Sequence, residues 1–195
     1  MIVKKIAFYI NTIVRNGAER AMTNLADQCV ENGYQVIFIT SYPVPVEYEL
    51  RKEIKRYNPQ SRVKRNICRI FRLRDICKRE QPDVLISFMA EPNMRAVLAT
   101  FGLKTRVIVS VRGDPNKEYK GKIYGFAGKY LLPLADGCVF QTKEARQWFP
   151  EKLQRKSKII ANAINMVFYQ IERSCEKLLL VSCGRLEKTK NYPLI

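Results

Sequence analysis

The sequence contains no histidine in its 195 residues. This absence excludes Ser-His-Asp hydrolysis, zinc sites with histidine ligands and acid-base catalysis by imidazole. No CxxC pair occurs among the six cysteines, which are Cys29, Cys68, Cys77, Cys138, Cys175 and Cys183. Several of them lie in apolar-periodic segments, where a free thiol behaves as a small hydrophobic side chain. We therefore expect reduced, buried thiols and a cytoplasmic location.

Long apolar runs are also missing. The segment of most continuous apolar character, Val84 to Ala90, is far shorter than the roughly 20 residues that cross a bilayer. We expect no spanning helix, so any membrane contact is peripheral. The N-terminal segment carries Lys4 and Lys5 and is followed at once by Asn11 and Arg15, without a small-residue cleavage site. This pattern indicates a strand rather than a signal peptide.

Acidic residues are scarce relative to basic ones. The 35 Lys and Arg against 18 Asp and Glu give a formal net charge of +17. Such a surface attracts anions, because net charge governs association rather than fold. Nucleic acid, acidic phospholipid and sugar diphosphates all fit it.

Apolar segments alternate with amphipathic ones along the chain. The strands predicted from this pattern are 2–10, 35–40, 83–88, 106–111, 137–141 and 158–161, and the helices are 17–31, 63–80, 92–101, 118–134 and 143–149. Asn32-Gly33 is typical of a helix C-terminus, and Thr142 is well placed as an N-cap. The alternation predicts an α/β fold, a Rossmann-like doubly wound parallel sheet.

A polar stretch, 162–177, precedes a new apolar strand, 178–183, and the sequence stops at Ile195. We expect a first domain over 1–170, a linker over 171–177 and the incomplete beginning of a second domain over 178–195. A lone strand and partial helix cannot bury their own faces.

Two loops after strands carry residues suited to phosphate. Gly17 lies at a strand-to-helix junction, where backbone amides favour anions, although a glycine that only makes the turn would give the same sequence. Arg185 and Lys190, in CGRLEKTKN (183–191), would lie at the carboxyl end of a strand and suit a diphosphate. Two solvated surface cations are the alternative. The GxGxxG fingerprint is absent, which argues against an NAD-binding enzyme and against a sugar-nucleotide epimerase.

Two further features are less specific. The turn SVRGDP (110–115) follows one strand, and Glu91 and Asn93 follow the neighbouring strand, so these loops are expected to meet. The segment 62–80 is a basic amphipathic helix. Its apolar residues Val63, Ile67, Ile70 and Cys77 either face the core or lie near an acidic lipid leaflet.

Together these segments resemble glycosyltransferase family 4 (group 1), whose members have the two-domain GT-B fold. The matching segments are NGAERAMTNLA (16–26), PDVLISF (82–88), SVRGDP (110–115), PLADGCVFQTKEARQWFP (133–150), IANAIN (160–165) and GRLEKTKN (184–191). The resemblance covers essentially the whole chain and implies a GT-B N-terminal domain, truncated at the start of the second domain. The sequence departs from the family pattern at Asn16, Arg112 and Ala163, where Gly, His and Pro are usual.

The resemblance also implies roles. Arg185 and Lys190 would be catalytic, binding the donor diphosphate and stabilising the leaving phosphate. Asn16, Gly17, Gly184 and Asn191 would bind the donor, while the acceptor side would hold Glu19, Glu91, Asn93, Arg112 and Asp114. Arg112 cannot act as a neutral acid or base, so its role would be electrostatic or hydrogen-bonding. No metal or other cofactor is implied.

The implied activity is retaining transfer of a hexose or N-acetylhexosamine from a nucleotide sugar. The expected acceptor is a lipid-linked or polysaccharide glycan, and the expected location is the inner, anionic face of the membrane. We expect the 195-residue chain alone to be inactive, because half of the donor site implied by the resemblance is absent, including the family's glutamate pair. The alternative is a non-catalytic basic α/β module that binds anionic lipid or nucleic acid, although no motif for specific nucleic-acid recognition is present.

Overall fold

The computed structural model describes residues 4–14, 16–44, 48–58 and 66–162. Within them, seven parallel strands form one sheet in the order β3-β2-β1-β4-β5-β6-β7. The strands are β1 (Lys5–Ile10), β2 (Gln35–Thr40), β3 (Lys55–Tyr57), β4 (Val84–Phe88), β5 (Arg106–Val111), β6 (Gly137–Phe140) and β7 (Ser157–Ile159). The chain moves outward from β1 in both directions, which confirms the expected Rossmann-like doubly wound sheet.

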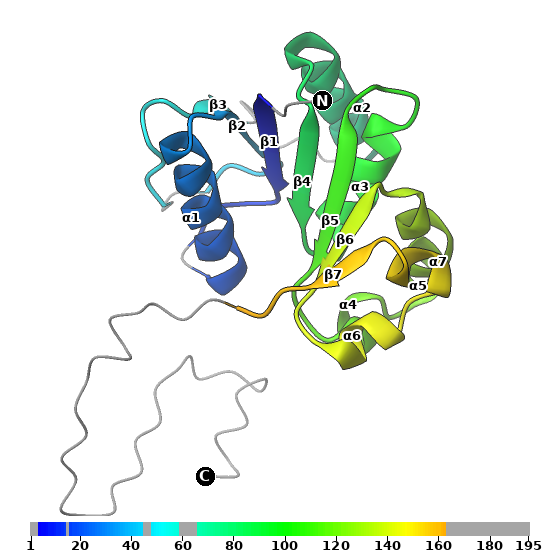
Figure 1. Cartoon of the computed structure of the whole chain (residues 1–195). Coiled ribbons are helices and arrows are strands. Elements are labelled where there is room, and N and C mark those ends of the chain that lie inside the picture. The colour runs from blue at the N-terminus through cyan, green and yellow to red at the C-terminus, as the bar shows by residue number, and fades with distance from the viewer. Residues whose placement is uncertain (1–3, 15, 45–47, 59–65, 163–195) are drawn as a thin grey trace, which may run out of the picture. The chain divides into compact units, whose positions relative to one another are not determined.

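Helices connect the strands and cover both faces of the sheet. The α-helices are α1 (Gly17–Glu31), α2 (Asn66–Glu80), α3 (Ala90–Thr100), α4 (Pro115–Glu118), α5 (Lys122–Phe126), α6 (Lys143–Gln147) and α7 (Glu151–Gln154). A π-helix, η1 (Ala127–Leu131), and a 3-10 turn, η2 (Leu132–Leu134), follow α5. Figure 1 shows α1 on one side of the sheet and α2 and α3 on the other.

The core has two parts, one on each face of the sheet. Alternate side chains of a strand point to opposite faces, so Phe8 and Ile10 pack with α1 residues such as Met22, whereas Ala7 and Tyr9 join a cluster with α2 and α3. The central strands are buried on both faces, as expected for a parallel sheet covered by helices.

Two helix ends follow the local sequence as expected. At the end of α1, Gly33 has φ 80°, and the N–H groups of Gly33 and Tyr34 donate to the carbonyls of Val30 and Cys29. These two bonds form a Schellman motif. At the start of α6, Thr142 Oγ1 accepts a hydrogen bond from the Ala145 N–H at 3.1 Å, which confirms the N-cap.

The long helix predicted over 118–134 is instead broken into several pieces. Gly121 adopts φ 90°, which separates α4 from α5, and Pro133 lies in the 3-10 turn that ends the crossover. The short strand β3 and the single-turn helix α7 were not predicted. Three residues with the sequence KRY offer no clear alternation, so an edge strand of this length is hard to recognise from periodicity.

The basic segment predicted as an amphipathic helix contains α2. Leu73, Ile76 and Cys77 are buried against the core, which supports the interpretation of a core-facing stripe. Ile67 was expected on that stripe but is 55% exposed. Two of the basic side chains donate to main-chain carbonyls, Arg72 to Asn58 and Arg74 to Ala99 and Phe101.

The four cysteines in the described part of the chain are free thiols. Cys77 and Cys138 are buried, and Cys29 is partly buried, as expected. Cys68 is exposed, so the expectation of burial is wrong for this residue, which lies on the outer side of α2. No helix of the described residues is both long and apolar enough to cross a bilayer.

Candidate functional site

The polar side chains of this sheet gather at the carboxyl ends of its strands, which we call the carboxyl edge. Because the strands are parallel, the residues that follow them meet there: Asn11 after β1, Ser41 after β2, Glu91 after β4, Arg112 after β5 and Gln141 after β6. In open α/β sheets ligands bind at this edge, beside the strand where the chain order reverses. That strand here is β1, with β2 and β4 as its neighbours.

Arg95 lies at the centre of the carboxyl edge. Its side chain is fully buried, with 0% exposure, and its guanidinium forms an ion pair with Glu91 one turn earlier on α3. The same guanidinium donates to Asn11 Oδ1 (2.8 Å), Asn66 Oδ1 (2.9 Å), Ser41 Oγ (3.2 Å), Tyr9 Oη (3.4 Å) and Tyr42 Oη (3.4 Å). A buried charge is tolerated when it is paired and hydrogen-bonded in this way.

Electrostatics keep Arg95 charged. Burial acts to lower its pKa, but the Tyr9 hydroxyl and the Glu91 carboxylate outweigh burial, and the pKa is raised. Arg95 therefore stays protonated at physiological pH. Its hydrogen bonds join side chains from the β1, β2, α2 and α3 segments. We call Arg95, Glu91, Asn11, Ser41 and Asn66 the Arg95 cluster.

Glu91 is the carboxylate of the Arg95 cluster, and it is partly exposed to solvent. Its side chain is 24% exposed, one oxygen accepts from Arg95, and the other accepts from Asn11 Nδ2 at 2.9 Å. A carboxylate has about four lone-pair positions, so unused acceptor positions remain after these two bonds. The carboxylate is thus fixed in orientation and still able to bind a hydroxyl or amide donor.

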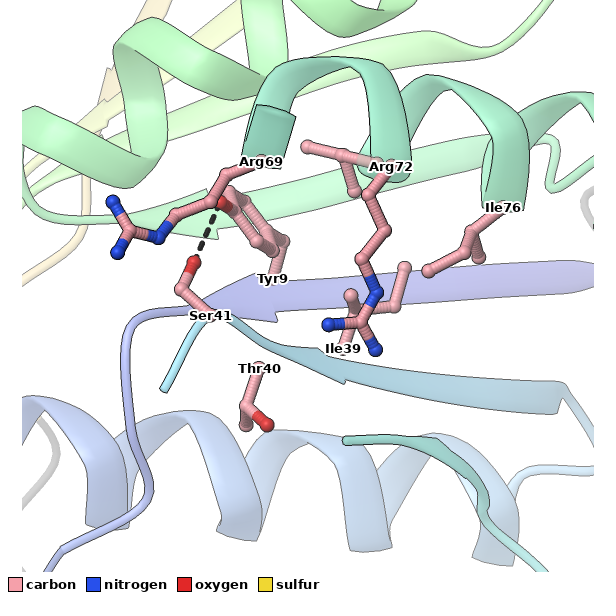
Figure 2. Close-up of a pocket in the computed structure, with 8 residues that line it drawn as sticks. Tyr9, Ile39, Thr40, Ser41, Arg69, Arg72 and Ile76 are labelled. Atoms are coloured by element: carbon pink, nitrogen blue, oxygen red, sulfur yellow. Dashed lines mark hydrogen bonds between the residues drawn. The ribbon is translucent and has the colours of Figure 1, made fainter. Parts of the chain in front are cut away.

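A small cavity lies beside the Arg95 cluster, between β2 and α2. Figure 2 shows Tyr9 and Ser41, whose hydroxyls are 2.7 Å apart, below Arg69 and Arg72 of α2. The cavity volume is about 10 Å³, which is enough for no more than a water molecule. A sugar or diphosphate would therefore bind on the open edge rather than inside this cavity.

The strained residue Met89 lies between β4 and α3, two residues before Glu91. Its backbone has φ 75° and ψ 157°, a region that side chains other than glycine rarely adopt. The Met89 N–H donates to the carbonyl of Ser110 on β5 at 3.1 Å, which holds the turn in place. Such strain at a strand-to-helix turn is typical of functional sites, where the surrounding fold imposes it.

Arg112 follows β5 and joins three strand ends. Its guanidinium lies over the Phe88 ring, 4.7 Å from the ring centre, and donates to Asn162 Oδ1 at 2.6 Å. Gln141 donates to the same Asn162 oxygen. Burial lowers the pKa of Arg112, and its Nε atom is buried without a hydrogen-bond partner. Arg112 therefore holds the chain where it leaves β7.

Two of the proposed acceptor-side residues have structural roles. Asn93 is completely buried: its Oδ1 accepts from Ser87 at 2.7 Å and its Nδ2 donates to the Ser110 carbonyl at 2.9 Å. Asn93 thus links β4 to β5 and presents no surface to a ligand. Asp114 is the N-cap of α4, where its Oδ1 accepts from the Asn116 N–H at 2.9 Å. It remains exposed.

The loop predicted to approach a phosphate lies at the start of α1. Asn16 is the N-cap residue by position, but its side chain makes no capping bond and instead lies 3.5 Å from Glu19 Oε1. Glu19 is 6% exposed, which leaves little of it for an acceptor. Gly17 is exposed, and a Cβ added to it would meet no atom within 4 Å. The fold itself therefore does not require glycine at this position.

Comparison with known proteins identifies the family. The model of Glycosyltransferase Family 4 matches residues 15–168, more than half of the chain. The chain belongs to glycosyltransferase family 4. It is 28% identical over 198 residues to a Campylobacter jejuni GalNAc-alpha-(1->4)-GalNAc-alpha-(1->3)-diNAcBac-PP-undecaprenol alpha-1,4-N-acetyl-D-galactosaminyltransferase, covering 96% of this chain and 54% of that protein. The chain thus spans about half the length of this curated relative.

Solved structures share the fold of this family 4 chain. A glycosyltransferase from Rickettsia africae superposes with a TM-score of 0.60 at 19% identity, over 86% of this chain and 45% of that one. The Anabaena protein Alr3699/HepE, in complex with UDP and glucose, gives a TM-score of 0.61 at 11% identity, over 85% and 46%. At these identities the likeness shows the GT-B half-fold alone.

Four of the proposed family 4 site residues lie outside the described residues: Gly184, Arg185, Lys190 and Asn191. The boundaries at 170 and 177 also fall there. Among the described residues, no group of three His, Cys, Asp or Glu side chains could hold a metal ion.

Four residues of the site were not predicted from the sequence: Arg95, Asn11, Ser41 and Asn66. A signal for Arg95 exists, because an arginine four residues after Glu91 interrupts the otherwise apolar second half of α3. The other three residues are ordinary polar residues at element ends, and only the tertiary fold brings them together.

Proposed function

We propose that the chain provides the acceptor-side half of a retaining glycosyltransferase. The enzyme would transfer a hexose or N-acetylhexosamine from a nucleotide sugar to a lipid-linked or polysaccharide acceptor in cell-surface glycan biosynthesis. The observation that carries this proposal is the Arg95 cluster at the ligand-binding edge of a family 4 chain. The name of the Campylobacter relative includes an undecaprenol-diphosphate-linked glycan, and the Anabaena structure holds UDP and glucose.

Glu91 is the acceptor-binding residue of this proposal. Arg95 and Asn11 fix its carboxylate, and its exposed lone pairs accept hydrogen bonds from sugar hydroxyl or N-acetyl N–H groups. Arg95 positions Glu91 without touching the sugar, because it has no exposed surface. Arg112 and Asp114 complete this side from the loop after β5.

The donor would be bound by residues from both ends of the chain. Arg185 and Lys190, with Gly184 and Asn191, bind the diphosphate and stabilise the charge that develops on the leaving phosphate. Asn16 and Gly17 approach the donor phosphates with backbone amides at the N-terminus of α1. The proposal includes no metal ion and no other cofactor.

The proposed location is the cytoplasmic face of the membrane. A formal net charge of +17 attracts the chain to anionic phospholipid, where a lipid-linked acceptor would be found. The acceptor is thereby concentrated at the same surface as the protein.

Calorimetry with a panel of nucleoside diphosphates tests the donor site. We expect the full-length form of the enzyme to bind one diphosphate with micromolar affinity, and Arg185→Ala or Lys190→Ala to abolish this binding. Lys158→Ala, which removes an exposed lysine of β7, is the matched control and should bind as the unmodified chain does. Gly17→Ala should weaken binding without unfolding the chain, because its Cβ meets no protein atom within 4 Å.

A second titration tests the acceptor site. The ligand is a short-chain polyprenyl-diphosphate-linked N-acetylgalactosamine oligosaccharide. Glu91→Gln should weaken its binding about tenfold or more, because a hydrogen bond to a charged group contributes about 1.5 to 3 kcal/mol. Glu53→Gln, at an exposed glutamate, should leave binding unchanged. Equal effects of the two substitutions would remove Glu91 from the site.

Turnover is the third test. We propose that the 195-residue chain by itself forms no glycosidic product from the nucleotide sugar, and product formation would contradict this. Salt-sensitive binding to any polyanion, with no preference among nucleoside diphosphates, would instead favour a non-catalytic basic α/β module that binds anionic lipid or nucleic acid.

A further inference from the structure

The helix formed by α5 and η1 exposes its apolar residues. Ile123 is 71% exposed, Phe126 is 64% exposed and Tyr130 is 53% exposed. The spacing of three and four residues places them on one side of the helix. The rings of Phe126 and Tyr130 are in contact, with centres 4.9 Å apart. Together these three side chains form an exposed apolar surface, which we call the α5 ridge.

The opposite side of the same helix is anchored to the protein. Tyr124 and Leu131 pack against the core, and Ala127 and Gly128 are buried. A Cβ at Gly128 would lie 3.1 Å from both Tyr119 and Trp148, so the helix backbone packs closely on this aromatic group. The α5 ridge is therefore presented by a helix packed firmly against the protein.

Lysines surround the α5 ridge. Lys120, Lys122 and Lys129 are all exposed, and Lys129 Nζ lies 5.2 Å from the centre of the Tyr130 ring. The sequence from 119 to 135 contains no Asp or Glu. Exposed aromatic and aliphatic side chains with lysines at their margins are typical of helices that lie in the interface of an anionic bilayer.

Tyr124, next to the α5 ridge in sequence, is influenced by the charges of the Arg95 cluster. Tyr124, which follows Ile123, is only partly buried, and its pKa is raised by burial and by the charge of Glu91. The start of α5 therefore lies within electrostatic range of the proposed acceptor residue.

We propose that the α5 ridge is a membrane-docking surface, in which Ile123, Phe126 and Tyr130 enter the headgroup region of an anionic bilayer and the three lysines bind lipid phosphates. This inference rests on the proposed function, because docking matters most for a lipid-linked acceptor. A second copy of the chain is a poor occupant, since a net charge of +17 opposes self-association.

Vesicle sedimentation of the full 195-residue chain tests this inference. The probes are phosphatidylcholine vesicles with and without phosphatidylglycerol, at low and high salt, in the absence of nucleotide and acceptor. Serine at all three ridge positions (Ile123→Ser, Phe126→Ser, Tyr130→Ser) should lower partitioning about tenfold or more. Lys122→Gln or Lys129→Gln should each lower it about fivefold on the anionic vesicles.

Phe71→Ser is the matched control. Phe71 is 59% exposed on α2, so its removal takes away a similar aromatic surface elsewhere. The control should partition as the unmodified chain does.

Three outcomes would overturn the inference: no binding of the unmodified chain to anionic vesicles, unchanged binding of the triple variant, or an equal loss in Phe71→Ser. DNA binding as strong as vesicle binding and insensitive to the triple variant would also overturn it in favour of general attraction to polyanions. Nucleoside diphosphate binding is measured without vesicles. Its persistence in any of these cases would leave the proposed transferase function standing.

Discussion

The guanidinium of Arg95 binds the carboxylate of Glu91 one helical turn earlier, and the two side chains differ sharply in exposure. Arg95 has 0% exposure and Glu91 has 24%, so the cation is internal and the anion faces solvent. An arginine in this position supports the orientation of a neighbouring carboxylate rather than binding a ligand itself. Four predictions test this arrangement and the fold that supports it.

Arg95→Met should destabilise the protein by about 3 kcal/mol or more, because it removes the cation that pairs with the partly buried Glu91 carboxylate and the donor to Asn11 Oδ1. Combining it with Glu91→Gln should recover part of that loss, since the unpaired charge is then gone. Urea unfolding of the two single variants, the double variant and the unmodified chain measures the coupling. A cost below about 1 kcal/mol for Arg95→Met would show that the cluster contributes little to stability.

Met89→Gly should be more stable than Met89→Ala by about 1 kcal/mol, the reverse of the usual order of these two residues. Both substitutions remove the same packing, but only glycine adopts φ 75° without strain. Thermal or urea unfolding of the pair gives the difference. The usual order, with alanine more stable, would mean that the turn before Glu91 is not strained in solution.

Glu80 should make stability depend on pH in the acid range. Its carboxylate accepts hydrogen bonds from Lys55 Nζ at 2.7 Å and from the Tyr57 hydroxyl, and these bonds lower its pKa from 4.5 to about 2. Because the folded pKa is the lower one, this contribution is present above the unfolded pKa and is lost as pH falls from 4.5 toward about 2.

Glu80→Gln should therefore cost about 1 to 3 kcal/mol near neutral pH and should flatten the acid limb of the stability curve. Urea unfolding at a series of pH values measures both effects. Glu49→Gln, at an exposed glutamate, serves as the control and should retain the slope of the unmodified chain. If the stability of the unmodified chain and of Glu80→Gln fell equally with decreasing pH, the lowered pKa of Glu80 would be contradicted.

The cysteines should differ widely in reactivity. Cys68 is exposed, whereas burial raises the pKa of both Cys77 and Cys138 to about 12. Alkylation at mildly alkaline pH, followed by peptide mass spectrometry, should modify Cys68 before Cys77 and Cys138, which should react only after denaturation. Rapid labelling of Cys77 in the native protein would indicate that α2 opens away from the sheet.

Much of the fold could be predicted because its signals are local. The positions of β2, β5 and α1 match the apolar pattern of the sequence, and Gly33 and Thr142 mark helix ends through bonds with residues a few positions away. The crossover between β5 and β6 was predicted poorly. Its apolar residues suggest one long helix, and the break depends on the backbone conformation of Gly121.

The sequence by itself determined the class of sheet, the family and the positions of Glu91 and Arg112 at strand ends, since periodicity and motif spacing are properties of the chain. Only the tertiary structure decided that Asn93 is internal, that Arg95 is the buried centre of the site and that Phe126 faces solvent. Burial depends on which segments the crossovers bring together. Asn11 and Glu91, 80 positions apart, meet only because β1 and β4 pair.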